Sequence, residues 1–295
     1  MADGIGNEDL RTRDYSSDLK GFALQKYTLI EDLSIASTPG WVTSYYRETA
    51  TALAASGTQR IRGGGRGSEF PTAKVTWALK NKLIESYRLK DFIPWEDHIS
   101  DNIDVTGRTL LRIAEGVVKA QEDEIFQIMT VALAGTGLNS TTTTAVGGDQ
   151  WDAPADAGDP PADLLDAMRL IAVAGFLEIY KGAGFLWINP YDYQSLLIWV
   201  YHKGAQAPKF AEMILADGRV QQTFMGLKVR VSNSVTVDYA LVGISKTCGT
   251  WQELQPLQVY RKDEPGEHVE IKAFQYGATQ LTTPTCMTLI DDLVT

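Results

Sequence analysis

Hydrophobic residues recur with helical spacing over the longest uninterrupted stretch of the chain, residues 104–134. Apolar or small side chains return every three or four positions, and only Gln121 interrupts this stripe. The other face carries charged side chains, among them Lys119 and Glu122, and is predicted to be solvated. At a rise of about 1.5 Å per residue, the predicted helix is about 45 Å long. It is long enough to be a spine on which other elements are laid.

Two segments before this helix, residues 41–49 and 74–89, have the chemistry of strands. The first is rich in aromatic and β-branched residues, and the second alternates apolar with polar positions. The glycine-rich residues 52–73 lie between them. Loops of this length are uncommon in compact domains unless they have a function. The pattern therefore predicts an extended β-hairpin over residues 41–95 that reaches beyond the body of the subunit.

The remaining segments alternate between helical and strand-like patterns. Residues 1–25 lack a core of their own and are predicted to be an arm, and 26–37 favour either a short helix or an extended apolar segment. After a polar connector at 138–161, the pattern predicts helices at 162–178 and 191–205, strands at 184–190 and 239–245, a hairpin region at 212–235, and three short final strands separated by turns at 263–266 and 277.

Composition narrows the class of protein. The formal net charge is −10, which argues against a protein that grips nucleic acid by neutralising phosphates but not against one that merely surrounds it. No run of eighteen apolar residues is present, so a membrane span is not expected. The two cysteines, Cys248 and Cys286, match no zinc or redox spacing and are expected to be reduced, partly buried thiols.

No pattern of catalytic or metal-binding residues emerges from the sequence. His98, His202 and His268 are far apart and are interpreted as structural or surface residues. The glycine-rich segment at 63–67 lacks the lysine and hydroxyl residue that would follow in a phosphate-binding loop. The aspartates between 149 and 159 do not have the spacing of a calcium loop, so a solvated linker is preferred. We therefore expect no enzyme activity, no cofactor and no metal.

The remaining class is a protein that acts through contacts with other subunits. The arm, the hairpin and its exposed aromatic residues are all suited to such contacts. Arginines in the hairpin could pair with carboxylates of an acidic neighbour, or they could simply keep a loop soluble. The residues expected at contacts between subunits are Arg60, Arg62, Arg66, Glu69, Trp77, Lys80 and Lys82.

The order of these segments resembles that of the major capsid proteins of tailed bacteriophages and related archaeal viruses, which have the Hong Kong 97-type fold. The likeness covers about 250 residues and rests on the order of individually weak motifs. One motif is a strand-to-helix step at 184–197, carried by Asn189, Pro190, Tyr191 and Leu196. The closing stretch matches at Gly226, Val229, Val231, Ser232, Asn233, Leu257, Val259, Ile271, Gly277, Pro284 and Ile290.

The resemblance implies an α+β subunit in five segments. These are an N-terminal arm at 1–40, an extended hairpin called the E-loop at 41–95, a peripheral domain at 96–160 with its spine helix at 104–134, an α/β axial domain at 161–253, and peripheral return strands at 254–295.

The resemblance also implies a function. The subunits would assemble in the host cytoplasm as pentamers and hexamers, forming the icosahedral shell of a virion around double-stranded DNA held without sequence-specific binding. Scaffolding, portal and decoration proteins are the further partners expected. Some members cross-link an E-loop lysine to an asparagine of a neighbour. Here residues 51–73 contain no lysine and the last 50 residues no asparagine, so we predict a non-covalent shell.

Two alternatives stay open at the level of sequence. An encapsulin, a cellular compartment that encloses enzymes, would share the fold, although the long glycine-rich hairpin favours the virus. An enzyme built on the α/β segment at 161–253 would be a protein of a different class, but the sequence offers it no constellation of catalytic residues.

Overall fold

A computed structural model describes residues 28–48, 77–100, 105–131, 139–142, 150–152, 158–203 and 223–294. Its elements in chain order are η1 (Ile30–Asp32), β1 (Ser34–Ser37), β2 (Val42–Glu48), β3 (Trp77–Leu83), β4 (Glu85–Pro94), α2 (Trp95–Ser100), α3 (Val105–Val131), β5 (Asn139–Thr142), α5 (Pro160–Val173), η3 (Leu177–Lys181), β6 (Gly184–Ile188), α6 (Pro190–Lys203), β7 (Thr223–Phe224), β8 (Leu227–Val231), β9 (Tyr239–Ile244), β10 (Gly249–Glu264), β11 (His268–Leu281), η4 (Pro284–Cys286) and β12 (Met287–Asp291). The predicted α+β class is confirmed.

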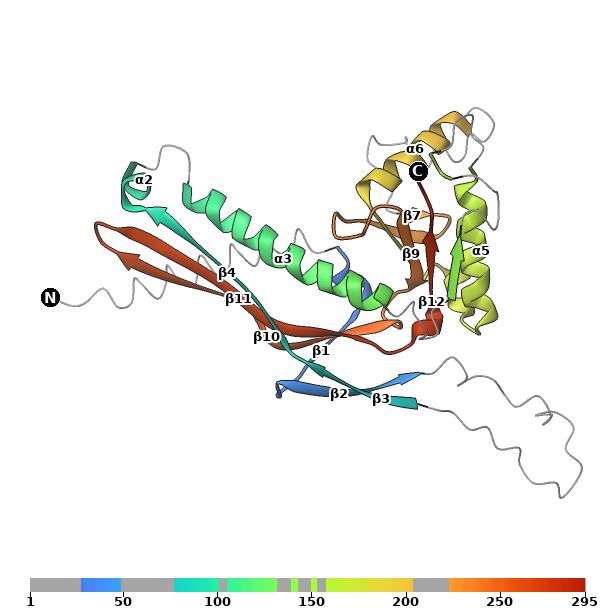
Figure 1. Cartoon of the computed structure of the whole chain (residues 1–295), viewed down its shortest axis with the longest axis horizontal. Coiled ribbons are helices and arrows are strands. Elements are labelled where there is room, and N and C mark those ends of the chain that lie inside the picture. Colours follow the sequence, from blue (N-terminus) through green and yellow to red (C-terminus); the bar gives the residue numbers. More distant parts are fainter. Residues whose placement is uncertain are drawn as a thin grey trace, which may run out of the picture.

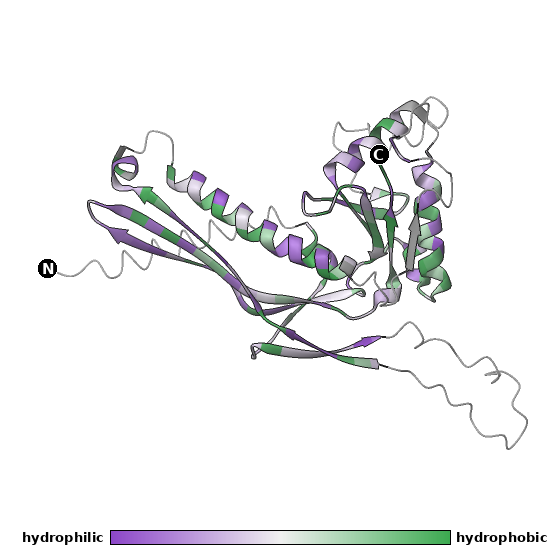
Figure 2. Cartoon of the chain, viewed as in Figure 1, coloured by the Kyte–Doolittle hydropathy of each residue, from purple (hydrophilic) through white to green (hydrophobic). Residues whose placement is uncertain are grey.

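The spine helix is present as α3 and lies along a long four-stranded sheet of order β1-β10-β11-β4 (Figure 1). Hydrophobic and hydrophilic positions alternate along this helix, and its apolar stripe packs on β4 and β11 (Figure 2). Gln121, the polar interruption of the stripe, is fully buried with it. The prediction of a helix is confirmed over the described residues 105–131.

The prediction that Glu122 lies on a solvated face is wrong. Its side chain is buried, and Oε1 accepts hydrogen bonds from the backbone N–H groups of Thr28 at 2.6 Å and Leu29 at 3.0 Å. Its other oxygen accepts one from the Ser232 hydroxyl at 2.6 Å. The start of the described chain and the end of β8 therefore cover this part of α3, which the helical period of α3 does not reveal.

Two of the final strands are much longer than the sequence predicts. The turn expected near 263–266 is present, with Gly266 at a φ of +85°. The turn expected at Gly277 is wrong, because this glycine lies inside β11, paired with Glu253 of β10. The ring of Trp251 lies where a Cβ on Gly277 would be, so this residue is a glycine because of close packing rather than chain reversal.

A six-stranded sheet of order β5-β12-β9-β6-β8-β7 stands at one end of the long sheet (Figure 1). The helix α5 packs against β12 and β5, and every residue of β6 is buried, as expected for a central strand with both faces covered. The strands predicted at 184–190 and 239–245 are confirmed, and so are the two helices, although the first ends at Val173 and residues 177–178 lie in the 3₁₀ turn η3. The return segment 254–295 is shared between the sheets, because β12 joins the six-stranded one.

The start of the described chain combines the two conformations that the sequence left open. A single 3₁₀ turn, η1, is followed by β1, which pairs in parallel with β10. Asp32 in this turn is buried, and its Oδ2 accepts a hydrogen bond from Trp187 Nε1 of β6 at 3.0 Å. This bond ties the chain start to the six-stranded sheet.

The predicted hairpin is present at its base, where β2 and β3 pair antiparallel. The run expected as one strand over 74–89 is divided at Ile84, whose buried side chain marks the passage from β3 to β4 in the four-stranded sheet. The short helix α2 was not predicted. In the described part of the chain, no helix combines the length and apolar character needed to cross a membrane.

Candidate assembly interface

One face of the β2–β3 hairpin is apolar and open. Antiparallel register places Val42 opposite Leu83 and Tyr46 opposite Leu79, and Trp77 lies further along the same face, opposite Glu48. All five apolar side chains are more than half exposed, from 53% for Trp77 to 67% for Leu83. An isolated two-stranded hairpin is only marginally stable in water. Large apolar and aromatic residues gathered on such a surface are typical of a contact with another protein.

The opposite face of the hairpin holds it to the body of the molecule. Gln280 Nε2 of β11 donates a hydrogen bond to the hydroxyl of buried Thr43 at 2.7 Å. The Glu48 backbone N–H donates to the carbonyl of Thr282 at 2.9 Å. These bonds fix the direction in which the hairpin leaves the long sheet (Figure 1).

Lys82 also belongs to this anchor. Its ammonium group lies 2.8 Å from a carboxylate oxygen of Glu85 and 2.9 Å from one of Glu124 on the spine helix. Burial raises the pKa of the Glu124 carboxyl, and the Lys82 charge opposes this rise. Lys82 thus contacts the spine of its own subunit, a role the sequence did not indicate.

The expected contact residues fall into three groups. Arg60, Arg62, Arg66 and Glu69 lie outside the described residues. Trp77 is on the open apolar face, and Lys80 is exposed on the same strand. Lys82 is engaged within the chain, as described above. Val42 lies on the open face but is not among the residues expected at contacts, although the alternation of Val42, Ser44 and Tyr46 is a signal that could have found it.

A second exposed apolar set lies on the six-stranded unit, at the end of α5 and on η3. Val173 is 76% exposed, and Leu177 and Tyr180 are more than half exposed. The helix α5 reaches this point with its other face packed on the sheet, so these three side chains point away from the core. They form a second candidate surface for a neighbouring subunit.

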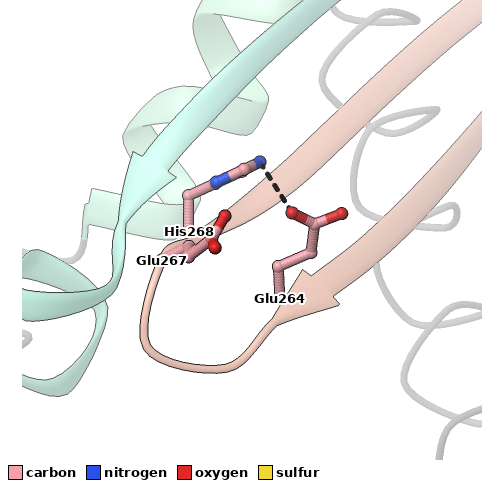
Figure 3. A group of neighbouring side chains, drawn as sticks. All are labelled: Glu264, Glu267 and His268. Atoms are coloured by element: carbon pink, nitrogen blue, oxygen red, sulfur yellow. Dashed lines mark ion pairs between the residues drawn. The ribbon is translucent and has the colours of Figure 1, made fainter.

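Glu264, Glu267 and His268 gather at the turn between β10 and β11 (Figure 3). Their ligand-type atoms lie within 4.8 Å of one another, and Glu264 Oε2 is 3.8 Å from His268 Nε2. Lys262 forms a hydrogen bond with Glu264, which is the main cause that lowers the pKa of this carboxyl. His268 also packs edge-on against Phe92 at 4.8 Å. We assign the group to the turn, because a lysine already neutralises one of its carboxylates.

Two buried aspartates have pKa values raised to about 6, and both serve the packing of the six-stranded unit. Burial is the main cause at each. Asp163 of α5 accepts a hydrogen bond from Trp151 Nε1 at 2.8 Å. Asp192 of α6 accepts one from the Asp238 backbone N–H at 3.1 Å.

A depression of about 250 Å³ lies over β4 and β11. Three of the side chains that line it are cationic, and none is a carboxylate, an imidazole or a hydroxyl. The lining residues are Arg88, Leu89, Lys90, Lys272, Ala273 and Phe274.

The sequence matches no protein-family model and no curated protein. The structure, in contrast, is similar to solved shell proteins over nearly its whole length. A virus-like particle from Pyrococcus furiosus superposes with a TM-score of 0.64 at 14% identity, covering 95% of this chain and 99% of the other. The capsid of the cyanophage P-SCSP1u gives 0.64 at 13% identity, covering 90% and 88%. The mature capsid of bacteriophage PhiM1 gives 0.58 at 12% identity, covering 90% and 87%.

The chain has the Hong Kong 97-type capsid fold. The fold expected from the resemblance is thus confirmed, although the identities of 12–14% are low. Within the capsid fold, α3 is the spine helix and β2–β3 is the described base of the E-loop.

Proposed function

We propose that the chain is the major subunit of an icosahedral capsid that encloses double-stranded DNA. The observation that carries this proposal is the open apolar face of the β2–β3 hairpin, on a fold shared with shell proteins. A hairpin anchored at one face and exposed at the other is suited to lie on an adjacent subunit. Burying its five apolar side chains in such a contact would supply the free energy that an isolated hairpin lacks.

The proposed subunit has the segments named from the sequence: the arm at 1–40, the E-loop at 41–95, the peripheral domain at 96–160 and 254–295, and the axial domain at 161–253. The sheet pairing of β12 gives the axial unit one strand from the last segment. The exposed set at the end of α5 would meet the next axial unit around a five-fold or six-fold axis.

The remaining finer points of the proposal concern charge and location. A net charge of −10 suits a lining that surrounds DNA without gripping it. Pentamers and hexamers would assemble in the host cytoplasm and become the virion shell, with scaffolding, portal and decoration proteins as further partners. The contacts between subunits would be non-covalent, and the protein would have no catalytic role.

Electron microscopy and size-exclusion chromatography of the chain expressed alone test this proposal. We expect closed shells, or rings of five and six subunits. Leu79→Asp places a charge on the open face without touching the anchor, so the variant should fold but not assemble. Gln127→Asp, on the exposed side of α3, changes the charge by the same −1 and should assemble. A variant lacking residues 52–72 tests the outer part of the hairpin in the same way.

The result that counts against the proposal is a monodisperse species of about 32.4 kDa at high protein concentration. Shells that survive Leu79→Asp would keep the shell function but reject the role of this face.

An encapsulin-type shell is the second candidate. The likeness to a virus-like particle is as strong as that to a phage capsid, with a TM-score of 0.64 for both. Shells isolated from the native source separate the two candidates. Nuclease-protected DNA is expected for the capsid, and an enclosed protein for the compartment.

A further inference from the structure

Two short connections join the six-stranded sheet to the four-stranded sheet, and each carries one cysteine. Residues 245–248 lead from β9 to β10, and residues 282–286 lead back from β11 to β12. They lie side by side, because the backbone N–H groups of Thr282 and Thr283 both donate to the carbonyl of Cys248 at 3.1 Å. The relative position of the two sheets therefore depends in part on how these connections are held together.

The two cysteines meet inside this joint. The turn η4 brings Cys286 back over Cys248, and their Sγ atoms are 2.6 Å apart. A disulfide bond is about 2.05 Å long, so only a small side-chain adjustment separates this arrangement from a bond. Both side chains are fully buried, and both are free thiols here. These are also the two cysteines of the whole chain, so a bond within one subunit can use no other pair.

We propose that Cys248 and Cys286 form a disulfide that fastens the joint between the two sheets when the chain meets a low-molecular-weight disulfide as oxidant. The thiolate of one cysteine attacks the oxidant, forms a mixed disulfide and releases one small thiol. The second thiolate then attacks the protein sulfur of this mixed disulfide and releases the other small thiol. Two protein thiols are oxidised, one small disulfide is reduced to two thiols, and the two protons end on those thiols.

The position of the pair sets both the rate and the effect of this reaction. Burial raises the pKa of the Cys286 thiol, which makes the reactive thiolate scarce in the folded chain. Oxidation of folded subunits is therefore slow, and the bond, once formed, is shielded from reductants. It joins residues 38 positions apart and closes a loop that contains all of β10 and β11. Such a loop constrains the unfolded chain and so stabilises the folded one.

The test uses the full chain with oxidised glutathione as the oxidant, added either to folded protein or during refolding from denaturant, so that access to the thiols does not limit the result. Free thiols are counted by alkylation under denaturing conditions followed by mass spectrometry. We expect loss of two hydrogens, a cross-linked peptide containing Cys248 and Cys286, and a Tm about 5–10 °C above that of the reduced protein. The double variant Cys248→Ser/Cys286→Ser is the control and should show the same Tm under both conditions.

Two fully alkylated thiols after refolding with oxidant would overturn the proposal, as would disulfide-linked dimers in place of the internal bond. A bond that forms without raising the Tm above that of the reduced protein would reject its fastening role. The inference concerns the inside of one subunit, so its failure is separate from failure of shell assembly.

Discussion

The Ser232 hydroxyl donates a hydrogen bond of 2.6 Å to Glu122, and this contact joins the spine helix to the end of β8, which lies in the other sheet. The other oxygen of Glu122 accepts three bonds from Thr28 and Leu29. One buried carboxylate thus connects the chain start, the spine and the six-stranded sheet. A carboxylate that accepts four hydrogen bonds fixes directions more firmly than apolar packing, because its partners must approach particular lone pairs.

Glu122→Gln should lower the stability of the unassembled subunit by about 2–3 kcal/mol, because the amide offers one acceptor oxygen and leaves buried donors unpaired. Equilibrium unfolding in urea measures this change. Gln127→Ala, at an exposed position of the same helix, should stay within about 0.5 kcal/mol of the parent. An unchanged midpoint in Glu122→Gln would mean that the junction does not hold the chain start in place.

Asp163 should make stability fall as the pH rises from about 4 to 6. The unfolded chain releases this proton near the ordinary pKa of an aspartate, 3.8, whereas the folded chain holds it until about pH 6, so the folded state binds more protons across this window. Burial is the main cause, and the neighbouring carboxylates of Asp159 and Asp166 add to it.

Asp163→Asn removes the charge that is costly at neutral pH and keeps an oxygen for the Trp151 N–H. The variant should therefore be more stable than the parent by about 2 kcal/mol at pH 7 and equal to it near pH 4. Urea unfolding across this pH range measures the difference. Parallel pH profiles for parent and variant would contradict the assignment.

Gly277→Ala should destabilise the subunit by about 1–3 kcal/mol, since its Cβ would collide with the indole of buried Trp251. Thermal unfolding measures the loss. Gly40→Ala is the matched control, because a Cβ there meets only the carbonyl oxygen of Val42 at 3.6 Å, an ordinary contact. Equal losses in both variants would show that backbone freedom, rather than the indole, is the cause.

Lys82→Met and Lys80→Met should differ although the two lysines are neighbours in sequence. Loss of Lys82 leaves the largely buried Glu124 without its cation, at a cost of about 1–2 kcal/mol, and loosens the hairpin at the spine. Lys80 is exposed, and its replacement should leave the free energy of unfolding of the subunit unchanged. Unfolding in urea compares them, and equal effects would reject the anchoring role of Lys82.

Much of the architecture could be predicted from local patterns. Each of these patterns depends only on residues close together in the sequence: the helical period of α3, the apolar run of β6, and the alternation in β2 and β3. The division of 74–89 at Ile84 was not predicted, because alternation continues across the point where the chain leaves one sheet for another. The sequence predicts a turn at Gly277 because the contact with Trp251 that requires a glycine there exists only once β10 lies alongside β11.

The candidate interface was predictable only in part. Trp77 follows from the alternation of its strand, which shows that one face of the hairpin is apolar. Which face of the hairpin is exposed depends on the other face being bound by Gln280 and Glu124. Both residues are far from the hairpin in the sequence.

The sequence by itself therefore determined the order and type of the main elements, and the resemblance that gave the fold, because side-chain periodicity is a local property. Only the tertiary structure decided that Glu122 is buried, that Lys82 is an anchor, and that Cys248 and Cys286 touch. Each of these depends on partners that are close in space but 38 to 110 positions apart in the chain, except for Glu85, which is three positions from Lys82. Tertiary folding, which closes long loops of the chain, brings such partners together, and the local conformational preference of each segment does not.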